Sequence, residues 1–205
     1  MTAAGIPTDP GLGGSGQGEP RAPSESPPIE LVIPDAAAME ALGARLAPLL
    51  RAGDLVLLDG ELGAGKTTLT RGLGEALGTR EPVTSPTFVL AREHPTASGI
   101  PLVHVDAYRL ATAAELDDLD LDWDGAIVVV EWGAGKIDPD APRLEVAIER
   151  PAGGDPLADD APRHVRIAAV GERFAELLPE LARAMSIGGA PARPPDEPAG
   201  NAPAP

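Results

Sequence analysis

The chain has 205 residues, 43% of them hydrophobic, which is enough for one ordinary domain with a core of its own. It carries 32 acidic and 16 basic residues, and a net charge of −16 argues against a protein that holds nucleic acid directly through a basic surface. It contains no cysteine, which excludes disulfides and thiolate metal sites.

Composition divides the chain into three parts. Residues 1–28 and 187–205 are rich in Gly, Pro, Ala and polar residues, and we predict that both are disordered tails. Residues 29–186 carry regular apolar patterns and form one predicted domain. The sequence shows neither a basic-then-apolar signal pattern nor an apolar run near the roughly 18 residues of a membrane-spanning helix. We therefore expect a soluble, cytoplasmic protein that does not contact membranes.

The predicted domain begins with alternating strands and helices. A short strand is expected at 29–34 and a helix at 35–50. The next strand, at 54–59, is a continuous apolar run, typical of parallel sheets that are buried on both faces. A second helix is expected at 66–77, where leucines recur at every fourth residue, and Gly78 then ends it.

The second half of the domain adds strands and changes character near its end. Expected next are strands at 88–94 and 101–108, a short helix at 113–119 and a buried strand at 126–131. Residues 143–150 and 163–170 alternate polar and apolar side chains, as half-exposed antiparallel strands do. Residues 171–185 predict an amphipathic helix in which Pro179 favours a kink. The sum is an α/β domain with a mixed sheet.

Residues 60–67, GELGAGKT, match the pattern G-x-x-x-x-G-K-[ST] and lie between a predicted strand and a predicted helix, as a phosphate-binding P-loop does. Gly60, Gly63 and Gly65 permit unusual backbone dihedrals. Backbone N–H groups of the loop, including that of Ala64, can then point into one concavity at a helix N-terminus. The expected fold class is a P-loop NTPase-like three-layer sandwich with a mixed, mainly parallel sheet and antiparallel C-terminal strands.

The side chains that end this motif supply charge and a metal contact. Lys66 offers a positive charge to β- and γ-phosphates, and Thr67 offers its hydroxyl to Mg²⁺. Thr68 lies within reach of the α-phosphate. The sequence therefore predicts a binding site for ATP and Mg²⁺.

A P-loop enzyme also needs a carboxylate near its metal, and two predicted strands end in one. Asp106 follows LVHV and Glu131 follows AIVVV. Because open α/β sheets bind ligands at the carboxyl ends of their strands, both are candidate catalytic residues. The alternative for either residue is an acid that merely ends a strand in solvent. The sequence leaves open which of the two contacts the metal directly.

The letters GAGK recur at 133–136, but this copy lacks the rest of the motif. The first motif glycine would fall on Val130, and the metal-binding hydroxyl would fall on Ile137. A proline two residues later directs the chain away from helix, so no helix N-terminus is available for an anion. We predict a mobile loop behind Glu131, with Lys136 as a solvated charge.

Four segments in this order resemble the TsaE (YjeE) family of P-loop ATPases: GELGAGKTTLTRGL (60–73), TSPTF (84–88), HVDAYRL (104–110) and VVEW (129–132). The resemblance covers about residues 29–186. It implies a protein that serves the threonylcarbamoyladenosine modification of tRNA and hydrolyses ATP while attached to the complex of TsaD and TsaB, with little activity alone. It also implies contact with tRNA only through that complex, which the acidic composition fits.

The resemblance implies roles by position. Gly63 to Thr68 would hold the phosphates, and Thr67 with Glu131 would hold Mg²⁺. Asp106 would line the γ-phosphate side, as a group that orients water or supports the metal.

Other residues have alternatives that the sequence leaves open. Ser85 and Thr87 lie in a loop that resembles a nucleotide-sensing switch, and they would contact the γ-phosphate or a partner, or only satisfy backbone groups in a turn. Tyr108 and Arg109 would hold the preceding aspartate or form part of a partner surface. Trp132 would pack near the nucleotide, on a partner or in the core.

The chain departs from the family pattern in two places. Met39 stands where many relatives have a threonine near the nucleotide base, so base contacts there are in question. The segment from Leu116 to Gly125 is also shorter than usual, which affects the approach to Glu131.

Two other functions fit a P-loop on a domain of this size. A small-molecule kinase is one, although such kinases usually carry an arginine-bearing lid over the transferred phosphoryl group, and the sequence shows no arginine-rich segment of that kind. The other is a nucleotide-sensing assembly module that binds ATP without hydrolysing it.

Overall fold

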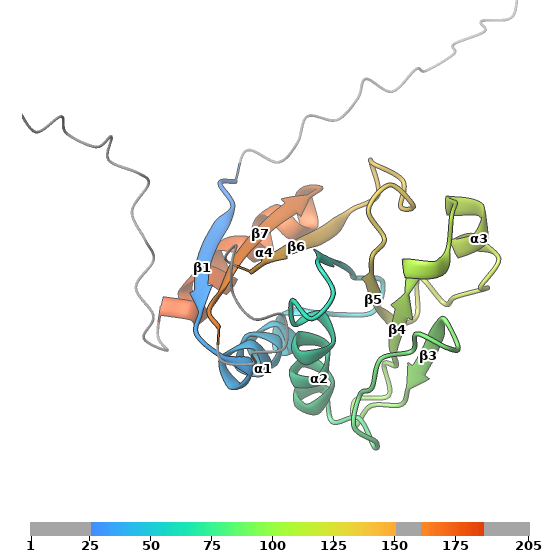
Figure 1. The fold of residues 1–205 in the computed structure, drawn as a ribbon, viewed down its shortest axis with the longest axis horizontal. Coiled ribbons are helices and arrows are strands. Elements are labelled where there is room, and N and C mark those ends of the chain that lie inside the picture. The colour runs from blue at the N-terminus through green and yellow to red at the C-terminus, as the bar shows by residue number, and fades with distance from the viewer. Residues whose placement is uncertain (1–25, 151–160, 187–205) are drawn as a thin grey trace, which may run out of the picture.

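The computed structural model describes residues 26–150 and 161–186, so nearly all of the two predicted tails lie outside the described residues (Figure 1). Seven strands form one sheet in the order β1-β7-β6-β2-β5-β4-β3. The strands are β1 Ile29–Ile33, β2 Leu55–Gly60, β3 Ala91–His94, β4 Leu102–Asp106, β5 Ile127–Glu131, β6 Arg143–Glu149 and β7 Arg163–Val170.

The sheet is mixed, with a parallel centre. Strands β6, β2, β5 and β4 run parallel to one another. Strand β7 is antiparallel to both β6 and β1, and β3 is antiparallel to β4. The predicted mixed sheet with antiparallel C-terminal strands is confirmed, with one addition: β6 also pairs in parallel with β2.

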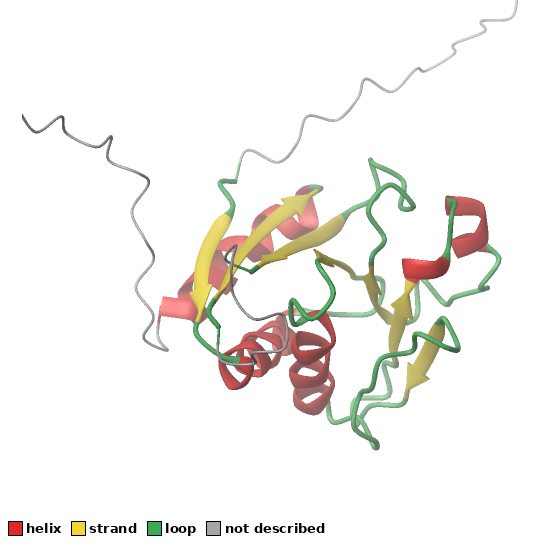
Figure 2. Ribbon diagram, viewed as in Figure 1, coloured by secondary structure: helices red, strands yellow, loops and turns green. Residues whose placement is uncertain are grey.

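Helices cover both faces of the sheet and complete the expected three-layer α/β sandwich (Figure 2). Alternating residues of β2 show the two faces: Leu58 packs against the larger helices, whereas Leu57 packs in the cluster that contains the short helix α3. None of the described helices is long and apolar enough to cross a membrane. The helices are α1 Ala36–Leu46, α2 Lys66–Leu77 and α4 Glu172–Ser186 on one face, and α3 Ala113–Asp117 on the other.

Two prolines affect their helices differently. The helix predicted at 35–50 ends at Leu46 and continues as a 3₁₀ turn, Ala47–Leu49. Pro48 has no N–H to donate to a continuing α-helix, which accounts for the change. Pro179, in contrast, lies inside α4, and the helix continues past it.

The strand predicted at 88–94 begins three residues later, at Ala91. The N–H groups of Val89 and Leu90 both donate to the carbonyl of Pro86, at 2.9 and 2.7 Å, so these residues form a tight turn. Leu90 has a φ of 65°, a left-handed conformation that a strand does not contain. The turn leaves Phe88 and Val89 exposed at its tip.

Two glycines bring α1 and α2 into backbone contact. A Cβ atom added to Gly43 would lie 2.0 Å from the carbonyl oxygen of Leu69, and one added to Gly72 would lie 1.9 Å from that of Glu40. Neither distance is possible for a real side chain. Helix α2 begins at Lys66, so this contact also fixes the helix that follows residues 60–65 of the predicted phosphate loop.

We expect Gly72→Ala to destabilise the protein, although glycine to alanine in a helix normally gains up to about 1 kcal/mol. The added methyl group must push the two helices apart, and such overpacking typically costs about 1–3 kcal/mol. Urea unfolding measures the change in the free energy of unfolding. Glu75→Ala, at an exposed position of the same helix, is the control and should change it by less than about 0.5 kcal/mol. A stabilised Gly72→Ala protein would contradict the described contact.

Candidate functional site

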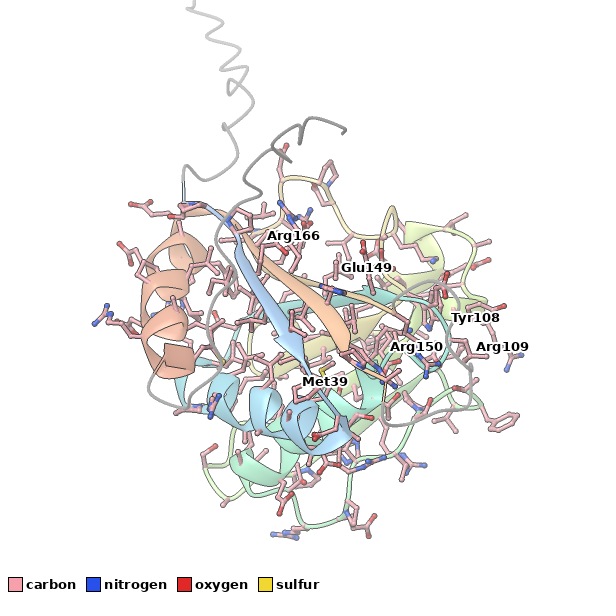
Figure 3. All side chains as sticks on the ribbon, turned by 60° about the vertical axis from the view of Figure 1, so that its left-hand side comes forward. Met39, Tyr108, Arg109, Glu149, Arg150 and Arg166 are labelled. Atoms are coloured by element: carbon pink, nitrogen blue, oxygen red, sulfur yellow. The ribbon has the colours of Figure 1, made fainter. Side chains whose placement is uncertain are left out.

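Three loops meet at one edge of the sheet, where the parallel strands β2, β5 and β4 end. Leu58 is paired with Glu131, and Glu131 is paired in turn with Asp106, so the two predicted acids lie side by side on the same face as α2. In Figure 3, Tyr108 and Arg109, which follow β4, lie on the same side of the molecule as the end of β6. The sheet thus gathers residues that are far apart in the sequence.

The loop between β2 and α2 has the backbone that its glycines permit. Gly60, Gly63 and Gly65 have φ values of 144°, 76° and 116°, in the region that favours glycine. A Cβ on Gly60 would also lie 2.3 Å from the carbonyl oxygen of Ile148 on the neighbouring strand. Ala64 is fully buried inside the loop, and Thr68 is half-buried at the start of α2. Any larger residue at position 60 would displace the loop from β6.

Lys66 is a buried cation of the site, with only 4% of its surface exposed. Its Nζ atom donates to the carbonyl oxygens of Gly60 at 2.7 Å and Glu61 at 3.0 Å, and it lies 3.7 Å from the centre of the Trp132 ring. Burial lowers the pKa of Lys66, and the nearby carboxylates, that of Glu131 first, oppose this shift. The ammonium group is therefore held by its own loop and by an indole face.

Glu131 connects the phosphate loop to β4. Its Oε1 atom accepts a hydrogen bond from the Thr67 hydroxyl at 2.8 Å and lies 2.8 Å from Nε2 of His104. Glu131 and His104 are both buried. The predicted pair Thr67 and Glu131 is thus in direct contact.

Asp106 faces a different loop. Its Oδ2 atom accepts from the Thr87 hydroxyl at 2.6 Å, and its Oδ1 atom accepts from the backbone N–H of Tyr108 at 3.0 Å. The hydroxyl groups of Ser85 and Thr87 are 2.6 Å apart. The Thr87 hydroxyl therefore binds Asp106 directly, and the Ser85 hydroxyl contacts Thr87, which ties the loop at 84–90 to the site.

Trp132 has an unusual backbone for a large residue, with a φ of 62°. Its N–H donates to the carbonyl oxygen of Leu58 at 3.1 Å, and its ring meets the Tyr108 ring edge-on at 5.2 Å. Lys136 donates from Nζ to the carbonyl oxygen of Trp132 at 2.7 Å and is half-buried. We predicted Lys136 as a solvated charge rather than a second phosphate ligand; it is half-buried and also binds the turn behind Trp132.

The second GAGK segment forms no helix start. The N–H of Lys136 donates to the carbonyl of Gly133, which closes a turn, and no helix occurs between β5 and β6. Met39 lies beneath the first segment: it is buried, and its Cε atom would touch a Cβ atom on Gly65 at 3.4 Å. Met39 thus supports the phosphate loop from below.

The oxygen atoms of the site suit Mg²⁺ chemically. Thr67 and Glu131 present a hydroxyl and a carboxylate in contact, and Asp106 adds a second buried carboxylate beside the single ammonium of Lys66. Within the described ranges, no three His, Asp or Glu side chains gather to hold a metal by themselves. A Mg²⁺ ion here would take its remaining oxygen ligands from phosphate groups and water.

Sequence reasoning missed Arg163, which is buried and donates from Nε to the carbonyl oxygen of Ala64 at 3.4 Å, and it also missed His104. His104 is part of the HVDAYRL segment, yet only the later residues of that segment received predicted roles. A strand places residues i and i+2 on the same face, so the prediction of β4 with Asp106 at its end already placed His104 on the site's face. That periodicity was the available signal. It gave no indication that the imidazole contacts Glu131.

Comparison with known proteins points to one family. The family model described as threonylcarbamoyl adenosine biosynthesis protein TsaE matches residues 33–154, a range that includes the loop and both carboxylates. The tRNA threonylcarbamoyladenosine biosynthesis protein TsaE of Streptomyces coelicolor is 58% identical over 142 residues, 67% of this chain and 94% of that protein. The protein of the same name from Bacillus subtilis is 37% identical over 147 residues, which cover 70% of this chain and 87% of that protein. The crystal structure of Bacillus subtilis YdiB aligns with a TM-score of 0.59 and 31% identity, over 77% of this chain and 96% of that one.

We expect Thr87→Val to loosen the loop at 84–90, because the variant keeps the side-chain shape but removes the donor to Asp106. Hydrogen exchange at the amides of Val89 and Leu90 should become faster. The free energy of unfolding should fall by about 1–3 kcal/mol, which is the usual cost when a buried acceptor loses its donor. Thr87→Ser keeps the hydroxyl and serves as the control. Equal exchange rates in the two variants would show that the hydrogen bond does not hold the loop.

Proposed function

The chain belongs to the TsaE family of tRNA threonylcarbamoyladenosine biosynthesis proteins, and we propose that it is the component of this machinery that binds and hydrolyses ATP. The observation that carries the proposal is the contact between Thr67, at the end of the phosphate-loop motif, and the buried carboxylate of Glu131. P-loop NTPases place a hydroxyl and a strand-end carboxylate together in this way around their metal.

The phosphate groups of ATP would bind to the backbone N–H groups of residues 63–68 and to Lys66. Nζ of Lys66 already contacts the loop, so a phosphate oxygen would replace the carbonyl oxygens that now accept its hydrogen bonds. Thr67 and Glu131 would hold Mg²⁺, whose positive charge would stabilise the negative charge of the phosphate groups in the transition state. Residues of the loop and of α2 therefore bind and align the substrate.

Asp106 would act on the γ-phosphate side, where it orients the attacking water. Two facts support the separate role: Asp106 has no described contact with Thr67, and its Oδ2 atom is bound to Thr87. The loop at 84–90 would then respond to the γ-phosphate through the same carboxylate. This arrangement gives the site a means of reporting the nucleotide state to a bound partner.

The partner surface would surround the site. Among the described residues, five large hydrophobic side chains are exposed, and four of them lie at this edge of the sheet: Leu62, Phe88 and Val89 in loops, and Tyr108 in the 3₁₀ turn Ala107–Arg109. Phe88 is 92% exposed and Leu62 is 88% exposed, and exposed apolar side chains that gather at one edge are typical of a protein-binding surface. We propose that the TsaD–TsaB complex covers this rim, and that tRNA meets the protein only through that complex.

We expect the isolated protein to hydrolyse ATP slowly and to turn over faster with TsaD and TsaB. Glu131→Ala and Asp106→Ala should each lower the stimulated rate by about 100-fold, since groups that hold the metal or orient water commonly contribute that much. Release of inorganic phosphate from γ-labelled ATP measures the rate. Glu176→Ala, at an exposed acid of α4, is the matched control.

Two results would contradict this proposal. Wild-type turnover in both site variants would remove the assigned roles. Transfer of the label to a small-molecule acceptor faster than to water would indicate a kinase instead.

We expect Phe88→Ser to weaken binding to the TsaD–TsaB complex by about tenfold, which corresponds to about 1.4 kcal/mol. Val32→Ser is the control, because Val32 is also exposed but lies on the edge strand β1. Biolayer interferometry with the immobilised complex measures both affinities. Equal affinities of the two variants would place the partner surface elsewhere.

A further inference from the structure

The strand β4 contains an imidazole where its neighbours are apolar. His104 is fully buried, and its strand neighbours Val103 and Val105 are buried in the opposite cluster. A buried polar side chain costs free energy unless its hydrogen bonds repay it. The Nδ1 atom of His104 has no hydrogen-bond partner within the part of the chain that the structure describes. The polar contact that this residue does make is therefore informative.

That contact is with Glu131. Nε2 of His104 lies 2.8 Å from Oε1 of Glu131. Because a carboxylate oxygen only accepts, the hydrogen of this bond is assigned to Nε2. The Thr67 hydroxyl reaches the same oxygen, also at 2.8 Å. Two donors thus fix a single oxygen of Glu131 from two different elements, β4 and α2.

We propose that His104 is a positioning residue for the ATP-hydrolysing site, which holds the carboxylate of Glu131 so that Oε2 is directed to the metal and phosphates. The inference rests on the proposed function. A carboxylate held at one oxygen by a single hydroxyl can rotate about its last side-chain bond, whereas a second donor from a rigid strand restricts that rotation. Partners of this kind typically change metal affinity or activity by about 10–100-fold when they are removed.

The neighbouring strand offers a matched control for the loss of a buried histidine. His94 on β3 is also buried and faces the same side of the sheet, since Arg92 pairs with His104 and His94 pairs with Leu102. Its Nε2 atom has no hydrogen-bond partner within residues 26–150 and 161–186, and burial lowers its pKa. No described contact joins His94 to Glu131 or to the phosphate loop. A purely structural role for buried histidines predicts similar effects at both positions.

The experiment compares four variants: His104→Leu, His104→Asn, His104→Gln and His94→Leu. Asn and Gln are both polar, but only the Gln amide reaches the position of Nε2. This pair therefore separates the effect of the hydrogen bond to Glu131 from the effect of a polar side chain. It remains informative if the Leu variant folds poorly. Isothermal titration gives the affinity for ATP with Mg²⁺ and with EDTA, and the ratio of the two measures how well the site holds the metal without any turnover. Turnover on the TsaD–TsaB complex is measured in parallel.

We expect the Mg²⁺-to-EDTA affinity ratio and the stimulated turnover to fall about tenfold or more in His104→Leu and His104→Asn. His104→Gln should restore both to within about threefold of the wild-type values, and His94→Leu should leave both unchanged. Affinity in EDTA should stay the same in all variants.

Equal ratios in His104→Asn, His104→Gln and His94→Leu would overturn the positioning role. If the wild-type protein itself shows no Mg²⁺-dependent ATP binding, the proposed function fails instead, and the two failures are distinguishable.

Discussion

The carboxylate of Glu131 joins three segments that lie far apart in the sequence. Thr67 reaches it from the start of α2, His104 reaches it from the middle of β4, and the strand register places Asp106 next to it. Two buried carboxylates at adjacent positions repel each other, and Lys66 is a buried cation that offsets them. The site is therefore an electrostatic unit whose parts require the parallel arrangement of β4, β5 and β2.

The parts of this unit that depend on local sequence were predictable. The spacing of glycines in 60–67 and the apolar runs before and after it determine a strand, a turn and a helix, all of which occur. The end of β5 at Glu131 followed from a buried apolar run, whereas the strand predicted at 101–108 ends two residues earlier, at Asp106. The failure of the second GAGK segment to start a helix followed equally from Ile137 and the nearby proline. In each case the decisive neighbours lie within about ten residues.

Features that depend on tertiary contact were not predictable from the sequence. The contact of His104 with Glu131 requires the offset between two strands, which no local pattern encodes. Trp132 combines a positive φ with an N–H bond to Leu58 on another strand. Lys136 finds its partner through that same unusual turn, so its side chain is not simply solvated. Long-range pairing decides each of these geometries.

The contact between α1 and α2 has a mechanical consequence. Packed side chains can change rotamer and so absorb small displacements. Here backbone lies against backbone, at Gly43 with Leu69 and at Gly72 with Glu40, so no side chain lies between the helices to adjust. A shift at the first turn of α2 must therefore displace α1 as well. We therefore expect the two helices to move together, so that a displacement of the loop before α2 would also reach the surface formed by α1.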